Sequence, residues 1–376
     1  MEIIKEKKLF APGPVLTSER IKKAALAPDL CHRSIDFQEI YGRLRKNLLK
    51  LFRADVNNYT IVVISGSGTA ANEAVISSVV KSDEKVLLIS NGEFGNRLRE
   101  IIECYQIALN HIEFDWGQYP DLNIIEEKLQ RDKKIGMVAM VYHETSTGMI
   151  NPVHEVGELA KRYGKTYFVD AISALGGELV DVQSDNIDFC TGVPNKNISG
   201  QPGVSFICVK RSQINKIEDV PRRNIYLRLQ SFIEKAEKYN QTPNTPAVVT
   251  FLTLNEALEE LFEEGLENRI ERYRKDARII REGVKKLGLK MLISDEKVMS
   301  NTVTSIFLPP ELNLRKFISK MYEDGYVVYP GKGPLLKRNM FQVANMGMIF
   351  PEDCYEFNGV MEKVFNELLE ENNGGI

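Results

Sequence analysis

The sequence predicts an α/β protein whose mostly parallel central sheet carries helices on both faces, followed by a smaller α+β domain. Short apolar runs without polar alternation are typical of strands buried on both faces, and they recur from about residue 60 onward. Segments with the period of a helix lie between several of these runs, as in strand–helix–strand units. The predicted strands are residues 60–65, 85–90, 136–142, 166–170 and 204–209.

The C-terminal part of the chain has a different pattern. After residues 242–249, apolar side chains at helical spacing predict a long helical region over 254–287, with a break at Gly265. Strand-like residues 301–309 and 326–331 then flank a helix-like segment at 314–325. This mixture predicts a second, α+β unit.

The length of the chain, 376 residues, is too great for one simple core. We therefore expect three parts. They are an N-terminal segment at 1–15 that packs near the small domain, a large domain at 16–255 and a small C-terminal domain at 256–376.

Composition narrows the class of protein. The net charge is −3, so neither nucleic acid nor an anionic membrane is an expected partner. No segment approaches the roughly 20 apolar residues of a membrane span, and the N-terminus lacks the apolar core of a signal peptide. The five cysteines are scattered without a CxxC pair, which indicates reduced thiols in a cytoplasmic protein and argues against a zinc site or a disulfide framework.

A candidate phosphate site follows the first predicted strand. In "ISGSGTAANEA", residues 64–74, glycines at the start of a helix let a phosphate approach backbone N–H groups. Gly66, Gly68 and Ala71 also fit a dinucleotide fingerprint, but the next strand ends in neutral Ser90 and Asn91 where that fingerprint needs an acid. We therefore favour a site for a single phosphate, against the alternative of a tight turn that binds nothing.

Three further features follow neighbouring strands of the predicted sheet. Asp170 ends its strand, the hydroxyl-rich "HETSTG" of residues 143–148 follows another, and Lys196 follows a predicted strand at 188–192. Ligands of open parallel sheets bind beyond the carboxyl ends of the strands. A lysine for a Schiff base, an acid for the pyridine nitrogen and anchors for a phosphate are the set that pyridoxal phosphate needs.

The chain resembles the class V aminotransferases, which have the fold of type I pyridoxal-phosphate enzymes. Among them it is most similar to the 2-aminoethylphosphonate–pyruvate transaminases, with the alanine–glyoxylate and serine–pyruvate transaminases next. The resemblance covers most of the chain, with matching order and spacing. The phrases that carry it are "APGPVLTSERI", "SGSGTAANEA", "SNGEFGNR", "HETSTGMINP", "VDAISALGG", "NKNISGQPG", "TPNTPAVV" and "MFQVANMG".

The resemblance implies two catalytic residues. Lys196 corresponds to the lysine that forms the Schiff base and then, as a free amine, carries the proton between two carbon atoms. Asp170 corresponds to the acid that keeps the pyridine nitrogen protonated. From the residues alone, a surface lysine is the simpler interpretation of Lys196. A cap for the residues that follow is the alternative for Asp170, but it is disfavoured because an apolar strand end is a costly place for an unpaired acid.

The resemblance also implies the cofactor contacts. Ser67, Gly68 and Thr69 would hold the phosphate, and Phe94 would stack on the ring, where relatives have Trp or Tyr. Thr145 would contact the ring hydroxyl, and Thr245 would reach the phosphate of the neighbouring subunit of a homodimer. The alternatives are an ordinary core phenylalanine at Phe94 and a simple turn at Thr245. His143 and Glu144 belong to the same motif as Thr145, and we assign them no chemistry.

One position departs from the family. Relatives carry the arginine for the substrate carboxylate in a phrase like "FRIGNIG", whereas this chain reads "FQVANMG" with Gln342 at that place. Glutamine lacks the charged fork that binds a carboxylate. Arg338, next to Lys337, and Arg33 in "CHRSIDF" are the candidates to replace it. A structural salt bridge is an equally good interpretation of Arg33.

Together these features predict a cytoplasmic, homodimeric, pyridoxal-phosphate-dependent aminotransferase without a metal. Its expected substrates are a small amine bearing a phosphonate, phosphate or carboxylate, such as 2-aminoethylphosphonate, and a 2-oxo acid such as pyruvate. Three alternatives stay open: an alanine or serine transaminase acting with glyoxylate or pyruvate, a lyase or decarboxylase on the same fold, and a binding protein that has lost activity.

Overall fold

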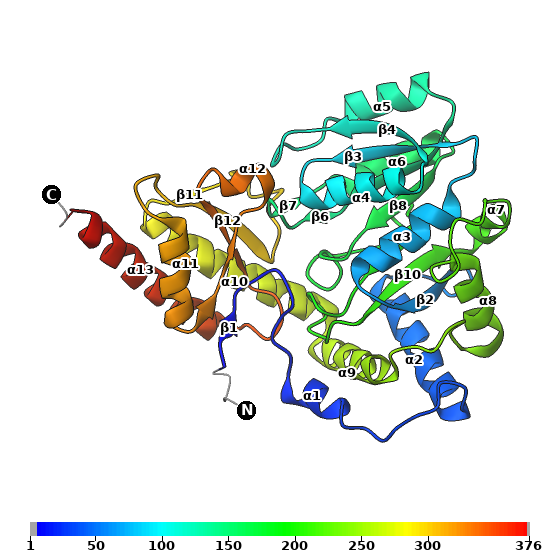
Figure 1. The fold of residues 1–376 in the computed structure, drawn as a ribbon, viewed down its shortest axis with the longest axis horizontal. Helices are drawn as coiled ribbons and strands as arrows, with labels where there is room; N and C mark the ends of the chain where they lie inside the picture. Colours follow the sequence, from blue (N-terminus) through cyan, green and yellow to red (C-terminus); the bar gives the residue numbers. More distant parts are fainter. Residues whose placement is uncertain (1–5, 374–376) are drawn as a thin grey trace.

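A seven-stranded sheet forms the larger part of the molecule in the computed structural model, which describes residues 6–373 (Figure 1). The strand order is β2-β10-β9-β8-β5-β3-β4. All neighbours are parallel except β10, which runs antiparallel to both β2 and β9. The strands are β2 (Tyr59–Ser65), β3 (Lys85–Ser90), β4 (Ala108–Glu113), β5 (Ile135–Val141), β8 (Thr166–Asp170), β9 (Phe189–Gly192) and β10 (Val204–Lys210).

The predicted strands are confirmed. Their side chains are buried on both faces of the sheet, which explains the apolar runs. In β8, for example, all five residues are buried. Within this seven-stranded sheet, the sequence analysis missed one strand, β4. Its sequence "ALNHIE" is mostly exposed or half-buried, as suits an edge strand that lacks a continuous apolar run.

Helices cover both faces of this sheet (Figure 1). Among them, α3 packs on β9 and β10, α4 on β3, β4 and β5, and α6 on β8. The helices of this part are α1 (Glu19–Ala24), α2 (Ile35–Leu51), α3 (Gly68–Val79), α4 (Glu93–Cys104), α5 (Leu122–Arg131), α6 (Val153–Arg162), α7 (Ile214–Glu218), α8 (Leu229–Tyr239) and α9 (Val248–Glu264). A short hairpin, β6 (His143–Glu144) with β7 (Met149–Ile150), and a 3-10 turn, η1 (Arg211–Gln213), complete it.

The C-terminal part has an antiparallel sheet of four strands in the order β11-β12-β15-β14. The predicted helix break at Gly265 is confirmed, because α9 ends there and the next helix begins. The strands are β11 (Lys290–Met291), β12 (Val303–Phe307), β14 (Tyr329–Pro330) and β15 (Met340–Ala344). The helices are α10 (Leu266–Lys286), α11 (Leu314–Glu323), α12 (Gly333–Leu336) and α13 (Pro351–Asn373).

The N-terminal segment returns to this C-terminal part. Strand β1 (Lys8–Leu9) pairs in parallel with β13 (Tyr326–Val327), and the ring of Phe10 stacks on Phe357 with centroids 4.4 Å apart. The segment then crosses toward the large sheet, where Pro12 contacts Lys196. It therefore connects the two parts of the molecule beside the site described below.

Two large hydrophobic clusters underlie the two parts. The first reaches from Ile21 to Ile270, and the second joins Phe10 to residues between Ile279 and Leu368. Residues 255 and 256, the predicted domain boundary, lie in the middle of α9, whose buried side chains belong to the first cluster. We propose that the boundary between the two domains lies in α10, after Ile270, where the first cluster ends. Within residues 6–373, no helix has the length and apolarity that crossing a membrane requires.

Close packing of α6 gives a test of this fold. A Cβ atom at Gly157 would overlap the carbonyl oxygen of Asp185, so we expect Gly157→Ala to destabilise the protein by roughly 1–3 kcal/mol. Gly359 in α13 faces open space, so Gly359→Ala should be neutral or stabilise by up to about 1 kcal/mol. Thermal unfolding midpoints of the two variants should therefore move apart, and equal midpoints would contradict the packing.

Candidate active site

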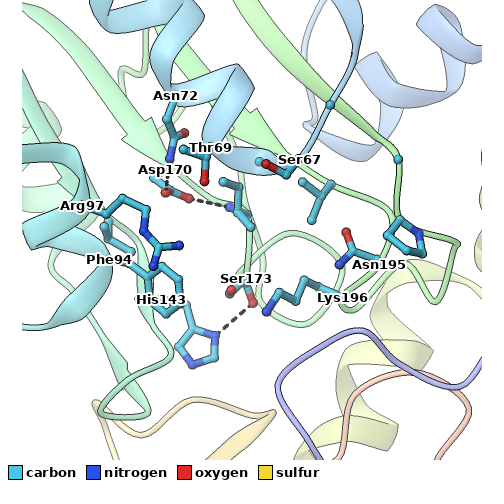
Figure 2. A pocket seen from close by; sticks show the side chains of 17 residues that line it. Ser67, Thr69, Asn72, Phe94, Arg97, His143, Asp170, Ser173, Asn195 and Lys196 are labelled. Atoms are coloured by element: carbon cyan, nitrogen blue, oxygen red, sulfur yellow. Dashed lines mark hydrogen bonds between the residues drawn. The ribbon is translucent and has the colours of Figure 1, made fainter. Parts of the chain in front are cut away.

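A cavity of about 340 Å³ opens at the carboxyl ends of the parallel strands. Because β2, β3, β5, β8 and β9 all end at this edge, the loops that follow them meet around it (Figure 2). Its volume is in the range of small-ligand sites. The strands contribute Ser67, Gly68 and Thr69 after β2, Phe94 after β3, His143 after β5, Asp170 at the end of β8, and Lys196 after β9.

Asp170 is the fixed acid of the cavity. One carboxylate oxygen accepts a 2.6 Å hydrogen bond from Asn72 Nδ2, and the other accepts a 2.9 Å bond from the backbone N–H of Ile172. Asn72 is oriented in turn by Thr191, whose hydroxyl donates to its Oδ1 at 2.7 Å. Burial raises the pKa of Asp170, while the two donors act in the opposite direction and favour the ionised form. The cavity therefore holds an oriented carboxylate that a bound cation would stabilise.

Lys196 lies on the loop between β9 and β10 and is half-buried. Its Nζ donates to the carbonyl oxygen of Pro12, and a side chain at Gly13 would come within 2.9 Å of its Cδ. Burial and the nearby ammonium of Lys332 lower its pKa to about 8, against the opposing attraction of Asp170. Near neutral pH a useful fraction of this amine is therefore unprotonated, as a nucleophile or base requires.

The N-terminus of α3 forms the wall between these two residues. Ser67 is its N-cap, yet the Ser67 side chain makes no capping hydrogen bond. A Cβ atom at Gly68 would overlap the end of the Ile172 side chain, so glycine allows the close packing seen here. The first N–H groups of a helix have no partner in a preceding turn, and the helix dipole favours an anion there. This end of α3 is thus suited to bind a phosphate.

Two cations flank Phe94 at the cavity. The guanidinium carbon of Arg97 lies 5.1 Å from the centre of the Phe94 ring, and Lys332 Nζ lies 4.7 Å from the same centre. The buried carboxylate of Glu144 accepts from the N–H groups of Phe94, at 3.1 Å, and of Gly95, at 3.0 Å. Glu144 thus fixes the start of α4 and so positions the ring.

His143 faces the cavity as a neutral side chain. Its Nδ1 lies 3.0 Å from the carbonyl oxygen of Ser173, which only accepts, so Nδ1 carries the hydrogen. Burial lowers the pKa of His143 to about 4, and within residues 6–373 Nε2 has no hydrogen-bond partner. Nε2 is therefore a free acceptor for a ligand donor.

The predicted cofactor residues Thr145 and Thr245 do not line this cavity. Thr145 is buried just behind it, and within the described part of the chain its hydroxyl has no partner. Thr245 is exposed, on the loop before α9. In that loop the N–H of Ala247 donates to Ser65 Oγ at 2.8 Å, so the loop lies beside the strand end that leads into the phosphate site.

The predicted substrate residues Arg33, Arg338 and Gln342 do not line the cavity either. Arg33 donates to Gln241 Oε1 at 2.8 Å and to a backbone carbonyl at 2.9 Å, which favours the structural interpretation of this residue. Arg338 lies over the ring of Phe307, at 4.7 Å. Gln342 is fully buried in β15. Its amide donates to the carbonyl of Thr145 at 2.6 Å and to Ser305 Oγ at 3.0 Å, so it is not available to a ligand in the cavity.

The sequence analysis missed Asn72, Arg97 and Lys332. The first two stand inside motifs that it singled out, "SGSGTAANEA" and "SNGEFGNR", and Lys332 directly follows the strand-like "YVVYPG". The spacing could have indicated Arg97, because it follows Phe94 by three residues and residues three apart share a helix face. Within the part of the chain that the structure describes, no group of three or more His, Cys, Asp or Glu side chains could hold a metal ion.

Comparison with known proteins identifies the family. The model of the aminotransferase class-V family matches residues 20–328. The chain belongs to the aminotransferase class-V family. Its family and the relatives named below show that this protein is a transaminase.

Curated relatives support the assignment over the full chain. The class-V chain is 34% identical to a 2-aminoethylphosphonate–pyruvate transaminase from Lysinibacillus sphaericus, over 97% of this chain and 98% of that relative. It is 33% identical to a bifunctional phosphonoacetaldehyde hydrolase/aminoethylphosphonate transaminase from Clostridioides difficile, covering 95% of this chain but 56% of that protein. Among solved structures, an alanine–glyoxylate aminotransferase from Nostoc matches with a TM-score of 0.90 at 25% identity, over 96% of each chain.

The lowered pKa of Lys196 can be measured in the cofactor-free protein. We expect trinitrobenzenesulfonate to label Lys196 with a midpoint near pH 8, below the ordinary lysine value, because the neutral amine is the reactive form. Lys332→Met removes a nearby cation and should raise the midpoint, whereas Asp170→Asn removes an attraction and should lower it. Peptide mass spectrometry across pH gives the midpoints. A wild-type midpoint above pH 10 would contradict this account.

Proposed function

We propose that this transaminase depends on pyridoxal phosphate and moves an amino group between a small phosphonate-bearing amine, such as 2-aminoethylphosphonate, and a 2-oxo acid such as pyruvate. One observation carries the proposal: Lys196, Asp170 and the free N-terminus of α3 line one cavity. The names of the relatives from Lysinibacillus sphaericus and Clostridioides difficile support the choice of amine.

The residues present fit pyridoxal phosphate. The N–H groups of Gly68 and Thr69 and the hydroxyls of Ser67 and Thr69 would hold its phosphate, and Gly68 gives the close approach that this needs. The oriented carboxylate of Asp170 suits a protonated ring nitrogen. Phe94 offers an aromatic face at the cavity wall.

Pyridoxal phosphate, when bound, supplies an electron sink that accepts an amino group from one substrate and gives it to the next. Asp170 would hold a proton at the ring nitrogen, because a buried carboxylate beside it favours the charged ring. Asn72 and Thr191 would keep that carboxylate oriented. Lys196 Nζ would hold the cofactor and then move a proton between substrate carbon and cofactor carbon, which its pKa of about 8 suits.

We also propose a homodimer in the cytoplasm. Thr245 is exposed beside the strand end that leads to the phosphate site, where a residue of one subunit is available to the other. Exposed apolar side chains near it, Tyr226 and Val249, would be covered by a partner. The cysteines are unpaired, which fits a reducing compartment.

Reductive trapping tests the cofactor and its lysine. We expect borohydride to bleach the visible absorption of the purified protein and to leave the reduced cofactor on the Lys196 peptide. Lys196→Ala should bind pyridoxal phosphate without a covalent bond and show no transamination. The matched control, Lys216→Ala, removes an exposed lysine and should keep both properties. A reduced adduct on another lysine would overturn the assignment.

Mixing two variants tests the shared site. If Thr245 completes the partner's site, Thr245→Ala should weaken cofactor binding, and the mixture with inactive Lys196→Ala should recover activity. In such a mixed dimer, the site with an intact Lys196 receives an intact Thr245. Sedimentation should show a dimer, with an interface above the standard ~1,600 Å². A fully active monomer, or no recovery on mixing, would reject this arrangement.

A further inference from the structure

Arg97 and Lys332 bring two positive charges to one aromatic ring at the cavity. The Arg97 guanidinium carbon is 5.1 Å, and Lys332 Nζ 4.7 Å, from the centre of the Phe94 ring. Arg97 lines the cavity, and Figure 2 shows it reaching in from α4 beside Phe94 and His143. Lys332 comes from the C-terminal part of the chain, immediately before α12. The two charges thus arrive from different parts of the fold.

Neither charge is neutralised by a hydrogen-bonded acid. The nearest carboxylate oxygen to Arg97 is Glu93 Oε1, at 3.7 Å, which is beyond hydrogen-bond distance. The ammonium of Lys332 makes no ion pair and no side-chain hydrogen bond within residues 6–373, although the residue is half-buried. The carboxylates of Glu93 and Glu144 also act on Lys332, but neither forms a hydrogen bond with it, and the oxygens of Glu144 are used by the N–H groups at the start of α4.

Both cations are held in place by packing. Glu144 fixes the first turn of α4, and Arg97 follows one turn later. Next to Lys332, Gly333 has φ +49 and lies so close to Trp116 that a Cβ atom would be 2.7 Å from the indole ring. These contacts attach the Lys332 segment to the large part of the molecule. The backbone that carries each of the two cations is therefore fixed at the edge of the cavity.

The other candidates for an anion partner are engaged elsewhere. Gln342 is buried and hydrogen-bonded to the carbonyl of Thr145, Arg33 donates to Gln241 and to the backbone of the same loop, and Arg338 lies on Phe307. An amine substrate that places its nitrogen at Lys196 must still present its acidic end to a cation at this cavity. Arg97, which lines the cavity, and Lys332, which lies over the ring of Phe94, are the cations without a hydrogen-bonded acid that the geometry offers.

We propose that Arg97 and Lys332 together bind the tetrahedral, doubly charged group of the amine substrate, a phosphonate or a phosphate. This inference rests on the proposed function, because it assumes an amine that reacts at Lys196. Two cations match a dianion, whereas a carboxylate carries one charge and gains less from the second cation. The pair would thus select the class of substrate at a place other than the usual arginine of the family.

Methylphosphonate provides a direct probe of the pair in the cofactor-loaded protein. We expect Lys332→Met to weaken methylphosphonate binding about ten- to hundredfold in calorimetry, the usual effect of losing a charge-assisted contact. Arg97→Met should act alike, and Arg97→Lys should recover part of the affinity because it restores the charge. The matched control is Lys337→Met, which removes an exposed lysine five residues along the chain and should bind as wild type does.

The half-reaction provides the second measurement. In Lys332→Met, the ratio of kcat/KM for 2-aminoethylphosphonate to that for alanine should fall by the same factor. O-phosphoethanolamine, compared in parallel, separates a phosphonate from a phosphate ester as the preferred dianion. Equal losses with alanine would mean that the pair is merely structural, and would overturn the inference.

Two further results would also overturn the inference. One is unchanged methylphosphonate affinity in Lys332→Met and Arg97→Met. The other is a loss of pyridoxal phosphate affinity with an unchanged substrate ratio, which would assign the pair to the cofactor's phosphate. The proposed function fails separately, if the loaded wild type transfers no amino group to pyruvate from any donor. Methylphosphonate binding would still decide the anion site in that case.

Discussion

The site depends on one constraint, the orientation of a buried carboxylate at the end of β8. Burial at this apolar strand end raises the pKa of the acid and so favours its neutral form. Two donors, the Asn72 amide and the Ile172 N–H, offset part of that effect and fix both oxygens. Asn72 is on α3, and Thr191, which orients it, is in β9. The carboxylate therefore also connects α3 to the sheet.

The parallel sheet explains why the other groups are found around this acid. Strands that run in one direction end at one edge, so side chains far apart in the sequence converge there. Lys196 needs one further element. Its loop is covered by the N-terminal segment, whose Pro12 carbonyl accepts from Nζ. That segment is anchored at its other side by the pairing of β1 with β13, so the C-terminal part of the chain helps to position the lysine.

Most of the sheet and the centre of the site could be predicted from the sequence, because their signals are local. Apolar runs gave the buried strands, and Asp170 and Lys196 were found at strand ends within motifs. The edge strand β4 was missed because it is too exposed to carry an apolar run. Arg33 and Arg338 were plausible partners of a substrate carboxylate because of their charge. Tertiary packing decides which carbonyl or ring an arginine contacts, and the sequence does not show this. Gln342 stands where relatives have an arginine, yet its amide donates to the carbonyl of Thr145 and not into the cavity.

Electrostatic effects connect Arg97 and Lys332 to Lys196. Lys332 lowers the pKa of Lys196, and Arg97 acts in the same direction, so both cations favour a neutral amine. An anion bound to the pair offsets their charge and thereby raises the pKa of Lys196. Binding effects between two sites are reciprocal, so a proton on Lys196 must strengthen anion binding by the same factor. If the proposed dianionic substrate binds there, its arrival and the proton held by Lys196 are coupled through the charges around Phe94.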